Sequence, residues 1–171
     1  MIRKAEPHDT RFLRDMLHHA FYRREGGPEA QEQPVYRYVY AWGRPGDAGV
    51  IALDEGFPVG AAWYRLFRED APGYGFVDER TPELAVAVVP SRRGRGFGEL
   101  LLTALMARAR EAGHARLSLA VERDNPAVGL YERLGFREVR RENETLIMVA
   151  EVADGPEERP AGKGRLGSGA D

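Results

Sequence analysis

The sequence predicts an α/β domain, because two segments of the chain each combine a strand pattern with a helix pattern. The first segment, Glu83–Gly113, begins with an apolar, β-branched run that Pro90 ends, and a turn rich in Gly and Arg then opens into a helical pattern. The second segment, residues 115–136, repeats the order of strand and helix. The rest of the chain is organised around the first segment.

The composition limits the classes of protein to consider. A chain of 171 residues is long enough for one domain with a real core, and its formal net charge of −2 gives no overall field that favours nucleic acid or an anionic membrane. The absence of cysteine excludes disulfides, thiolate nucleophiles and cysteine metal sites. No apolar segment approaches about 18 residues and the N-terminus has no signal-peptide core, so we expect a cytoplasmic protein.

The chain opens with a short strand, formed by its first five residues, and continues with a helix. Apolar residues recur at helical spacing over residues 12–21, behind a start that Asp9 or Thr10 can cap. His18 and His19 are neighbours on this helix, so their side chains diverge by about 100° and cannot readily share a metal. We interpret both histidines as ordinary surface or rim residues.

The next part of the chain is a polar loop followed by an aromatic segment. Glu25–Pro34 contains two glycines and two prolines and is typical of a mobile loop. In Val35–Trp42, Tyr36 and Tyr40 fit one face of a helix, whereas these two with Tyr38 fit one face of a strand. We favour the helix. Such an aromatic band either belongs to the core or walls an acceptor pocket.

Two short strands and a long loop lead to the central strand. Gly49–Leu53 and Val59–Phe67 have strand patterns and are joined by a turn at residues 54–56. The loop Arg68–Pro82 is long for a compact domain, and loops of this length often have a function. We expect it near the mouth of any site.

The turn after the central strand has the features of an anion site. Gly94, Gly96 and Gly98 alternate with Arg95 and Phe97 where a helix should begin. Glycine tolerates positive φ and close approach, so several main-chain N–H groups can point at one anion, beside the positive end of the helix dipole.

The charges beside this turn indicate a polyanionic ligand, most simply a pyrophosphate, because Arg92, Arg93 and Arg95 add full positive charges. A short glycine cluster also occurs in ordinary turns, and Arg-Gly alternation in disordered RNA-binding segments. The preceding strand and following helix favour the anion site. The dinucleotide fingerprint and the P-loop both fit poorly, because the glycine spacing and the Lys-Ser/Thr pair that they require are missing.

The helix after the turn has one apolar face and ends at Gly113. That face consists of Phe97, Leu100, Leu101, Ala104, Leu105, Ala109 and Ala112.

The C-terminal half begins with the strand Ala115–Val121. Asn125 and the proline after it start a helix that Gly135 ends, since proline is well tolerated in a first turn and glycine at a C-terminal stop. The strands Arg137–Arg141 and Thr145–Val152 follow, joined by a hairpin turn. The remaining residues, 153–171, contain too few large apolar side chains to offset their ordering entropy, so we expect a disordered tail after a single domain of residues 1–152.

Two motifs make the chain resemble the GCN5-related N-acetyltransferases (GNAT family), over roughly residues 83–139. The first motif stands as Arg93, Gly94, Arg95, Gly96, Phe97 and Gly98 behind Pro90. The second stands as Asn125, Pro126, Ala127, Leu130, Tyr131, Gly135 and Phe136. The two motifs follow each other in the family's order and at its usual spacing.

The resemblance implies a fold and a cosubstrate. The fold is a central mixed, mostly antiparallel twisted sheet of about six or seven strands with about four flanking helices, splayed between the central strand and the next. The cosubstrate is acetyl-CoA, with its pyrophosphate in the glycine turn and its pantetheine bonded along the central strand by main-chain groups near Ala87 and Val88. No metal is required.

The resemblance also suggests roles in direct acetyl transfer to an amine, which must lose a proton. Glu83 is the best-placed carboxylate to accept that proton, with Asp78 and Glu79 as substitutes. The alternative interpretation is that Glu83 is a surface carboxylate at a strand end without a catalytic role. Tyr131 occupies the position of the proton donor to the leaving thiolate. Asn125 either holds the pantetheine or fixes the helix start.

The most direct function is therefore a CoA-dependent N-acetyltransferase acting on a small amine or a protein amino group. Acidic residues in the loop Arg68–Pro82 slightly favour a cationic acceptor. One alternative is a non-catalytic acyl-CoA sensor or interaction domain on the same scaffold. Another is RNA binding through the arginines of the turn, which the overall charge disfavours. A homodimer, with two sheets paired through the last strand, is compatible with the sequence.

Overall fold

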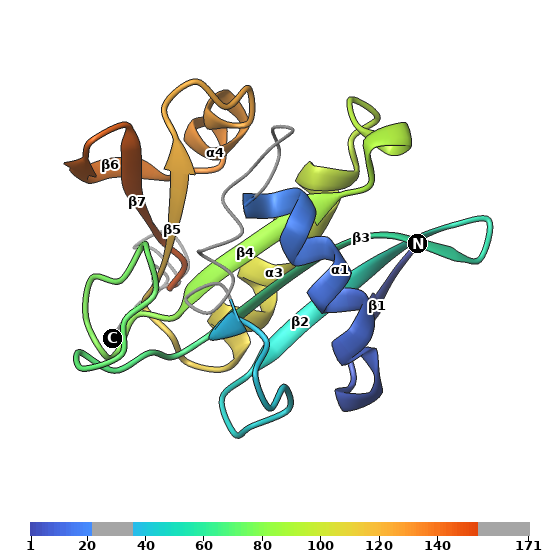
Figure 1. Cartoon of the computed structure of the whole chain (residues 1–171), viewed down its shortest axis with the longest axis horizontal. Coiled ribbons are helices and arrows are strands. Elements are labelled where there is room, and N and C mark those ends of the chain that lie inside the picture. The colour runs from blue at the N-terminus through green and yellow to red at the C-terminus, as the bar shows by residue number, and fades with distance from the viewer. Residues whose placement is uncertain (22–35, 154–171) are drawn as a thin grey trace, which may run out of the picture.

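The computed structural model describes residues 1–21 and 36–153, which form one seven-stranded sheet flanked by three α-helices (Figure 1). The strands are β1 (Ile2–Lys4), β2 (Ala48–Asp54), β3 (Phe57–Arg65), β4 (Glu83–Val88), β5 (Arg116–Glu122), β6 (Arg137–Glu142) and β7 (Thr145–Glu151). The helices are α1 (Thr10–Phe21), α3 (Phe97–Glu111) and α4 (Val128–Arg133), with single 3₁₀ turns at Pro7–Asp9 and Pro90–Arg92.

The sheet is mixed and mostly antiparallel, in the order β1-β2-β3-β4-β5-β7-β6. β4 and β5 are the parallel neighbours, and they pair only at Glu83 and Ser118. Beyond that pair they diverge, as Figure 1 shows, while β5 pairs along its whole length with β7. The predicted splay after the central strand is thereby confirmed, and it leaves one edge of β4 without a partner strand.

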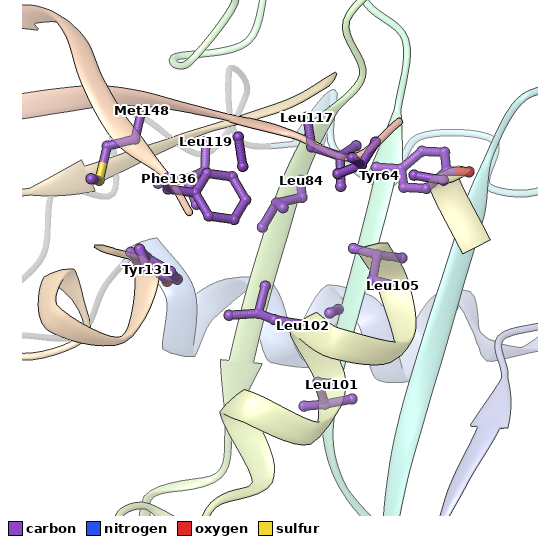
Figure 2. Packing of buried hydrophobic residues seen from close by; sticks show 14 of the residues in the cluster. Tyr64, Leu84, Leu101, Leu102, Leu105, Leu117, Leu119, Tyr131, Phe136 and Met148 are labelled. Carbon is purple, nitrogen blue, oxygen red and sulfur yellow. The ribbon is translucent and has the colours of Figure 1, made fainter. Parts of the chain in front are cut away.

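Hydrophobic side chains cover both faces of the sheet. On one face α3 buries Leu101, Leu102 and Leu105 against β4, β5 and the segment around α4 (Figure 2). On the other face α1 packs Leu13 and its neighbours against β3 and β4. Because side chains alternate along a strand, neighbouring residues of β3 and β4 belong to opposite cores.

The aromatic segment does not form the helix that we expected over Val35–Trp42. Tyr36 is helical and residues 37–43 form turns, with N–H groups of Val39 and Tyr40 donating to the Tyr36 carbonyl at 2.9 and 2.8 Å. The described residues therefore contain three α-helices in place of about four. Tyr38, Val39 and Trp42 are buried core residues, whereas Tyr36 and Tyr40 are exposed.

Other boundaries differ by small amounts. α4 begins at Val128, three residues after Asn125, because the first turn closes through Asn125 itself. The last strand, β7, lies inside the sheet between β5 and β6, so it has no free edge for the expected pairing with a second sheet. The predicted loop at residues 25–34 and the tail after residue 153 lie outside the described residues. Among the helices that are described, none has the length and apolar character needed to cross a bilayer.

Candidate functional site

A pocket of about 510 Å³ lies where β4 separates from β5. Its walls come from the open edge of β4, the glycine turn with the first turn of α3, the start of α4 and the end of α1. Nine of the eleven residues predicted to form a site line it: Ala87, Val88, Arg93, Gly94, Gly96, Phe97, Gly98, Asn125 and Tyr131. Glu83 and Arg95 do not line it.

The glycine turn presents main-chain donors to this pocket. Gly94 and Gly96 have φ angles of 76° and 90°, in the left-handed region that side chains disfavour. Gly96 is the N-cap of α3 without any side-chain cap, and the first helical bond runs from Leu100 N–H to the Gly96 carbonyl at 3.2 Å. The N–H groups at the first three helical positions therefore have no helical acceptor, which makes this end of α3 a suitable place for an anion.

The three arginines of the turn are oriented differently from one another. Arg92 donates to Asp54 at 2.7 Å, and Arg95 lies 4.0 Å from the same carboxylate. This contact with Arg92 is the main reason why the pKa of Asp54 is lowered. Arg93 instead donates from Nε to the Val88 carbonyl at 3.1 Å, at the pocket wall.

The open edge of β4 exposes main-chain groups of every second residue. Val89 N–H donates to Val59 at 2.8 Å, and N–H and C=O of one peptide point in opposite directions, so the Val88 carbonyl points away from β3. The Ala87 carbonyl points toward β3, because it would be 2.9 Å from a Cβ atom placed on Gly60. Of the two predicted residues, Val88 therefore offers its main chain to the pocket, and Ala87 contributes to the wall without offering its main chain.

Asn125 makes the contacts expected of a residue that fixes the helix start, which is one of its two expected roles. Its Oδ1 atom accepts the N–H of Ala127 at 2.9 Å, and its carbonyl accepts the N–H of Val128 at 3.1 Å. These bonds fix the turn from which α4 begins, while Asn125 also lines the pocket.

Tyr131 forms the wall opposite β4. Its ring packs edge-on against Phe136, with 6.0 Å between ring centroids, and Figure 2 shows it at the end of the buried cluster. Burial raises the pKa of Tyr131 to about 12. The phenol is therefore neutral at any physiological pH and is available as a hydrogen-bond donor.

Glu83 is buried at the point where β4 and β5 part. It is 2% exposed, and its Oε2 atom accepts hydrogen bonds from the Tyr38 hydroxyl and from the Gly75 N–H, the latter at 2.8 Å. Its Oε1 atom and the Oγ atom of Ser118, its partner on β5, are buried without a hydrogen-bond partner among the described residues. Burial raises the pKa of Glu83 to about 7, against the opposing effect of the Tyr38 bond. The carboxylate is thus neither on the surface nor in the pocket wall.

His19 is a pocket residue to which the sequence analysis gave no functional role. It reaches the pocket from the last turn of α1, and its pKa is lowered by burial and then by the nearby positive charge of Arg93. Its interpretation as a rim residue was correct in position, but no sequence signal tied it to the glycine turn. Arg133 and Glu99 also line the pocket and form an ion pair at 3.3 Å.

The described residues contain no group of three or more His, Asp or Glu side chains that could hold a metal ion. The chemistry that this pocket supports directly is the binding of a polyanion at one end and hydrogen-bond donation by a neutral phenol at the other.

Comparisons with known proteins identify relatives of this arrangement. The family model described as "Acetyltransferase (GNAT) family" matches residues 10–136. A mycothiol acetyltransferase of Corynebacterium aurimucosum is 37% identical over 111 residues, which are 64% of this chain and 33% of that protein. The chain thus spans about a third of the length of this curated relative.

Solved structures share the fold over most of the chain. A ribosomal-protein-alanine N-acetyltransferase from Brucella melitensis is 28% identical, with a TM-score of 0.64 over 88% of this chain and 99% of that one. A PaiA N-acetyltransferase from Thermoplasma acidophilum, solved in complex with coenzyme A, has a TM-score of 0.66 at 16% identity and covers 88% of this chain and 98% of its own.

The raised pKa of Glu83 predicts a pH dependence of stability. The Glu83 carboxyl keeps its proton up to about pH 7 in the folded protein but loses it near pH 4.5 in the unfolded chain. Its contribution to the free energy of unfolding is therefore full below pH 4.5 and is lost as the pH rises to about 7. Thermal unfolding of Glu83→Gln, followed by circular dichroism from pH 4.5 to 8, should lack that decline. Glu111→Gln, at the exposed end of α3, is the control and should keep it. Parallel curves for wild type and Glu83→Gln would contradict the burial argument.

Proposed function

The chain belongs to the GNAT family of acetyltransferases, and from this premise we propose that it transfers the acetyl group of acetyl-CoA to a primary amine. The observation that carries the proposal is the uncapped N-terminus of α3 behind Gly94 and Gly96, beside the open edge of β4 and across the pocket from Tyr131. These three features provide, in order, a place for a diphosphate, for an amide chain and for a leaving sulfur.

The residues of the pocket fit coenzyme A. The N–H groups between Gly94 and Glu99, together with Arg93, would hold the diphosphate, because glycines at positive φ and a helix N-terminus concentrate donors on one anion. The Val88 main chain would bond the pantetheine amides as a neighbouring strand would. Asn125 fixes the turn before α4, which borders this pocket.

Acetyl-CoA supplies a thioester whose carbonyl carbon an amine attacks, forming a C–N bond while the C–S bond breaks. Tyr131 donates a hydrogen bond to the departing sulfur. An ordinary thiol has a pKa near 8.5, so a phenol with a pKa of about 12 stabilises the thiolate by hydrogen bonding and keeps its own proton. Main-chain N–H groups on the open edge of β4 polarise the carbonyl.

Glu83 receives the proton that the amine loses. A base is most effective when its pKa lies near the working pH, and Glu83 meets this condition with a pKa of about 7. Because Glu83 does not line the pocket, the proton would reach its Oε1 atom, which is buried without a hydrogen-bond partner among the described residues, through a relay such as a bound water.

The acceptor belongs to one of two classes, a small-molecule amine or a protein amino group. The names of the relatives support both classes, since one is named a mycothiol acetyltransferase and another a ribosomal-protein-alanine N-acetyltransferase. We assign the activity to a single domain of residues 1–152, in the cytoplasm.

An acetyl-CoA turnover screen tests the activity. The purified chain, incubated with acetyl-CoA and pooled amines or amino-terminal peptides, should release free thiol faster with at least one pool than without acceptor. Thermal stabilisation by acetyl-CoA without thiol release from any pool would favour the non-catalytic sensor.

Gly96→Val tests the anion site. A Cβ atom at Gly96 meets nothing within 4 Å, so the cost is the left-handed φ, about 1–2 kcal/mol, together with the loss of space for a ligand. Gly56→Val is the matched control, since Gly56 has a φ of 86° and equally open surroundings in the β2–β3 turn. Calorimetry should show CoA binding lost in Gly96→Val alone. Equal affinity in both variants would refute the site.

Tyr131→Phe tests the donor to the leaving sulfur. We expect kcat to fall by about 10²-fold with little change in the KM for acetyl-CoA, because the bond forms as the thiolate develops. Tyr64→Phe is the control, because Tyr64 belongs to the same buried cluster but does not line the pocket. An unchanged kcat in Tyr131→Phe would remove this residue from the mechanism.

A further inference from the structure

Two neighbouring side chains of β3 hold the main chain of the aromatic segment. Trp63 Nε1 donates to the carbonyl of Tyr38 at 2.8 Å, and the Arg65 guanidinium donates to the carbonyls of Arg37 and Tyr40 at 3.0 and 2.8 Å. Residues two apart on a strand point to the same face, so both side chains reach the segment together. The segment is irregular, and the sheet supplies the hydrogen bonds that a helix would have supplied.

Arg65 is itself fixed by a buried ion pair. Its Nη2 and Nε atoms bond the two oxygens of Asp47 at 2.5 and 3.1 Å, and the side chains are 1% and 4% exposed. Asp47 also accepts the N–H groups of Gly43 and Arg44 at 3.0 Å each. Buried ion pairs add little net stability because of desolvation, but a fork-shaped pair of this kind fixes geometry.

The geometry that it fixes is that of the Tyr38 phenol. The hydroxyl donates to Glu83 Oε2 and accepts the N–H of Tyr74 at 2.8 Å. The loop packs so closely here that a Cβ atom on Gly73 would overlap Glu83 Oε1 and would lie 2.7 Å from the Tyr38 hydroxyl. Gly75 then donates its N–H to the same Glu83 oxygen. Tyr38 thus joins the aromatic segment, the loop and the carboxylate.

We propose that Tyr38 is a positioning residue for Glu83, held in place by Arg65 and Asp47. Its phenol anchors Oε2 and leaves Oε1 as the atom that exchanges a proton. The proposal deepens the proposed function, because it rests on Glu83 as the group that accepts the proton of the amine.

The surroundings of Glu83 determine the direction of the effect. The groups that face it are Tyr38 and Arg37 from the aromatic segment, the Gly75 N–H from the loop, Arg65 opposite it on β3, and Ser118 on β5. Tyr74 of the loop stacks on Tyr38, with 6.5 Å between ring centroids. Burial favours the neutral carboxyl, whereas Tyr38, the Gly75 N–H and Arg37 favour the carboxylate, with Tyr38 the largest of the three. Removing the Tyr38 hydroxyl should therefore raise the pKa of Glu83.

The first measurement determines the pKa of Glu83 by NMR, in the absence of substrates. In the full chain labelled with ¹³C at glutamate side-chain carboxyls, the Glu83 signal is identified by its loss in Glu83→Gln and titrated by NMR. In Tyr38→Phe its midpoint should move up by about one pH unit. Tyr40→Phe makes the same chemical change at a side chain that is 73% exposed, and should leave the midpoint unchanged. An unmoved midpoint in Tyr38→Phe overturns the proposal.

A second variant tests whether Arg65 holds Tyr38 in place. Arg65→Lys keeps the charge that pairs with Asp47 but loses the fork that reaches two carbonyls. The Glu83 midpoint should move in the same direction as in Tyr38→Phe, and the two changes combined should move it no further than Tyr38→Phe alone. Independent, additive shifts would show that Arg65 does not act through Tyr38.

The pH dependence of kcat/KM separates this proposal from the proposed function. If the acidic limb of the kcat/KM profile moves together with the NMR midpoint of Glu83, the positioning role of Tyr38 and the role of Glu83 as base are both supported. A midpoint that moves while the limb stays fixed supports the positioning role and removes Glu83 as the base.

Discussion

The separation of β4 from β5 is the constraint on which the whole site depends. The two strands share only the Glu83–Ser118 pair, after which β5 continues with β7 and β4 continues alone. A buried strand edge without a partner leaves main-chain donors and acceptors unpaired, which is costly unless something else bonds them. Arg93 bonds one of these groups, the Val88 carbonyl, and the remaining edge faces a pocket of the size that an extended ligand fills. The pocket is thus a consequence of the sheet topology, and the side chains add to it.

Burial gives the two titratable groups of the proposed chemistry their different states. Tyr131 and Glu83 both lie in apolar surroundings that oppose their charged forms, so both pKa values rise. For a phenol the rise only makes it a more reliable neutral donor. For a carboxyl the rise to about 7 changes its state near neutral pH, and hydrogen bonds from Tyr38 and Gly75 keep the rise from going further. One physical effect therefore yields a fixed donor at one position and a proton acceptor at the other.

The parts predicted from the sequence are those in which local rules act alone. Gly94 and Gly96 adopt the positive φ that the glycine turn led us to expect, and most strands followed from their apolar patterns. The aromatic segment was misread because several of its carbonyls accept hydrogen bonds from Trp63 and Arg65, which lie far away in sequence. For the same reason Glu83 resembled a surface residue at a strand end: the groups that bury it, Tyr38 and Gly75, come from two other segments. Arg95 was expected beside the anion, but its guanidinium lies 4.0 Å from Asp54 at the end of β2.

The charged side chains around the pocket differ in kind from the main-chain donors. Arg92 with Asp54, and Arg133 with Glu99, are solvent-accessible ion pairs, and such pairs contribute little to stability. Exchanging such a partner for a diphosphate costs little, whereas the N–H groups of the glycine turn are already oriented and need no rearrangement. In the proposed site the fixed dipoles would set where the diphosphate sits, and the arginines would adjust to it. This division suits a protein whose net charge is −2, because its attraction for anions must come from one local arrangement and not from the molecule as a whole.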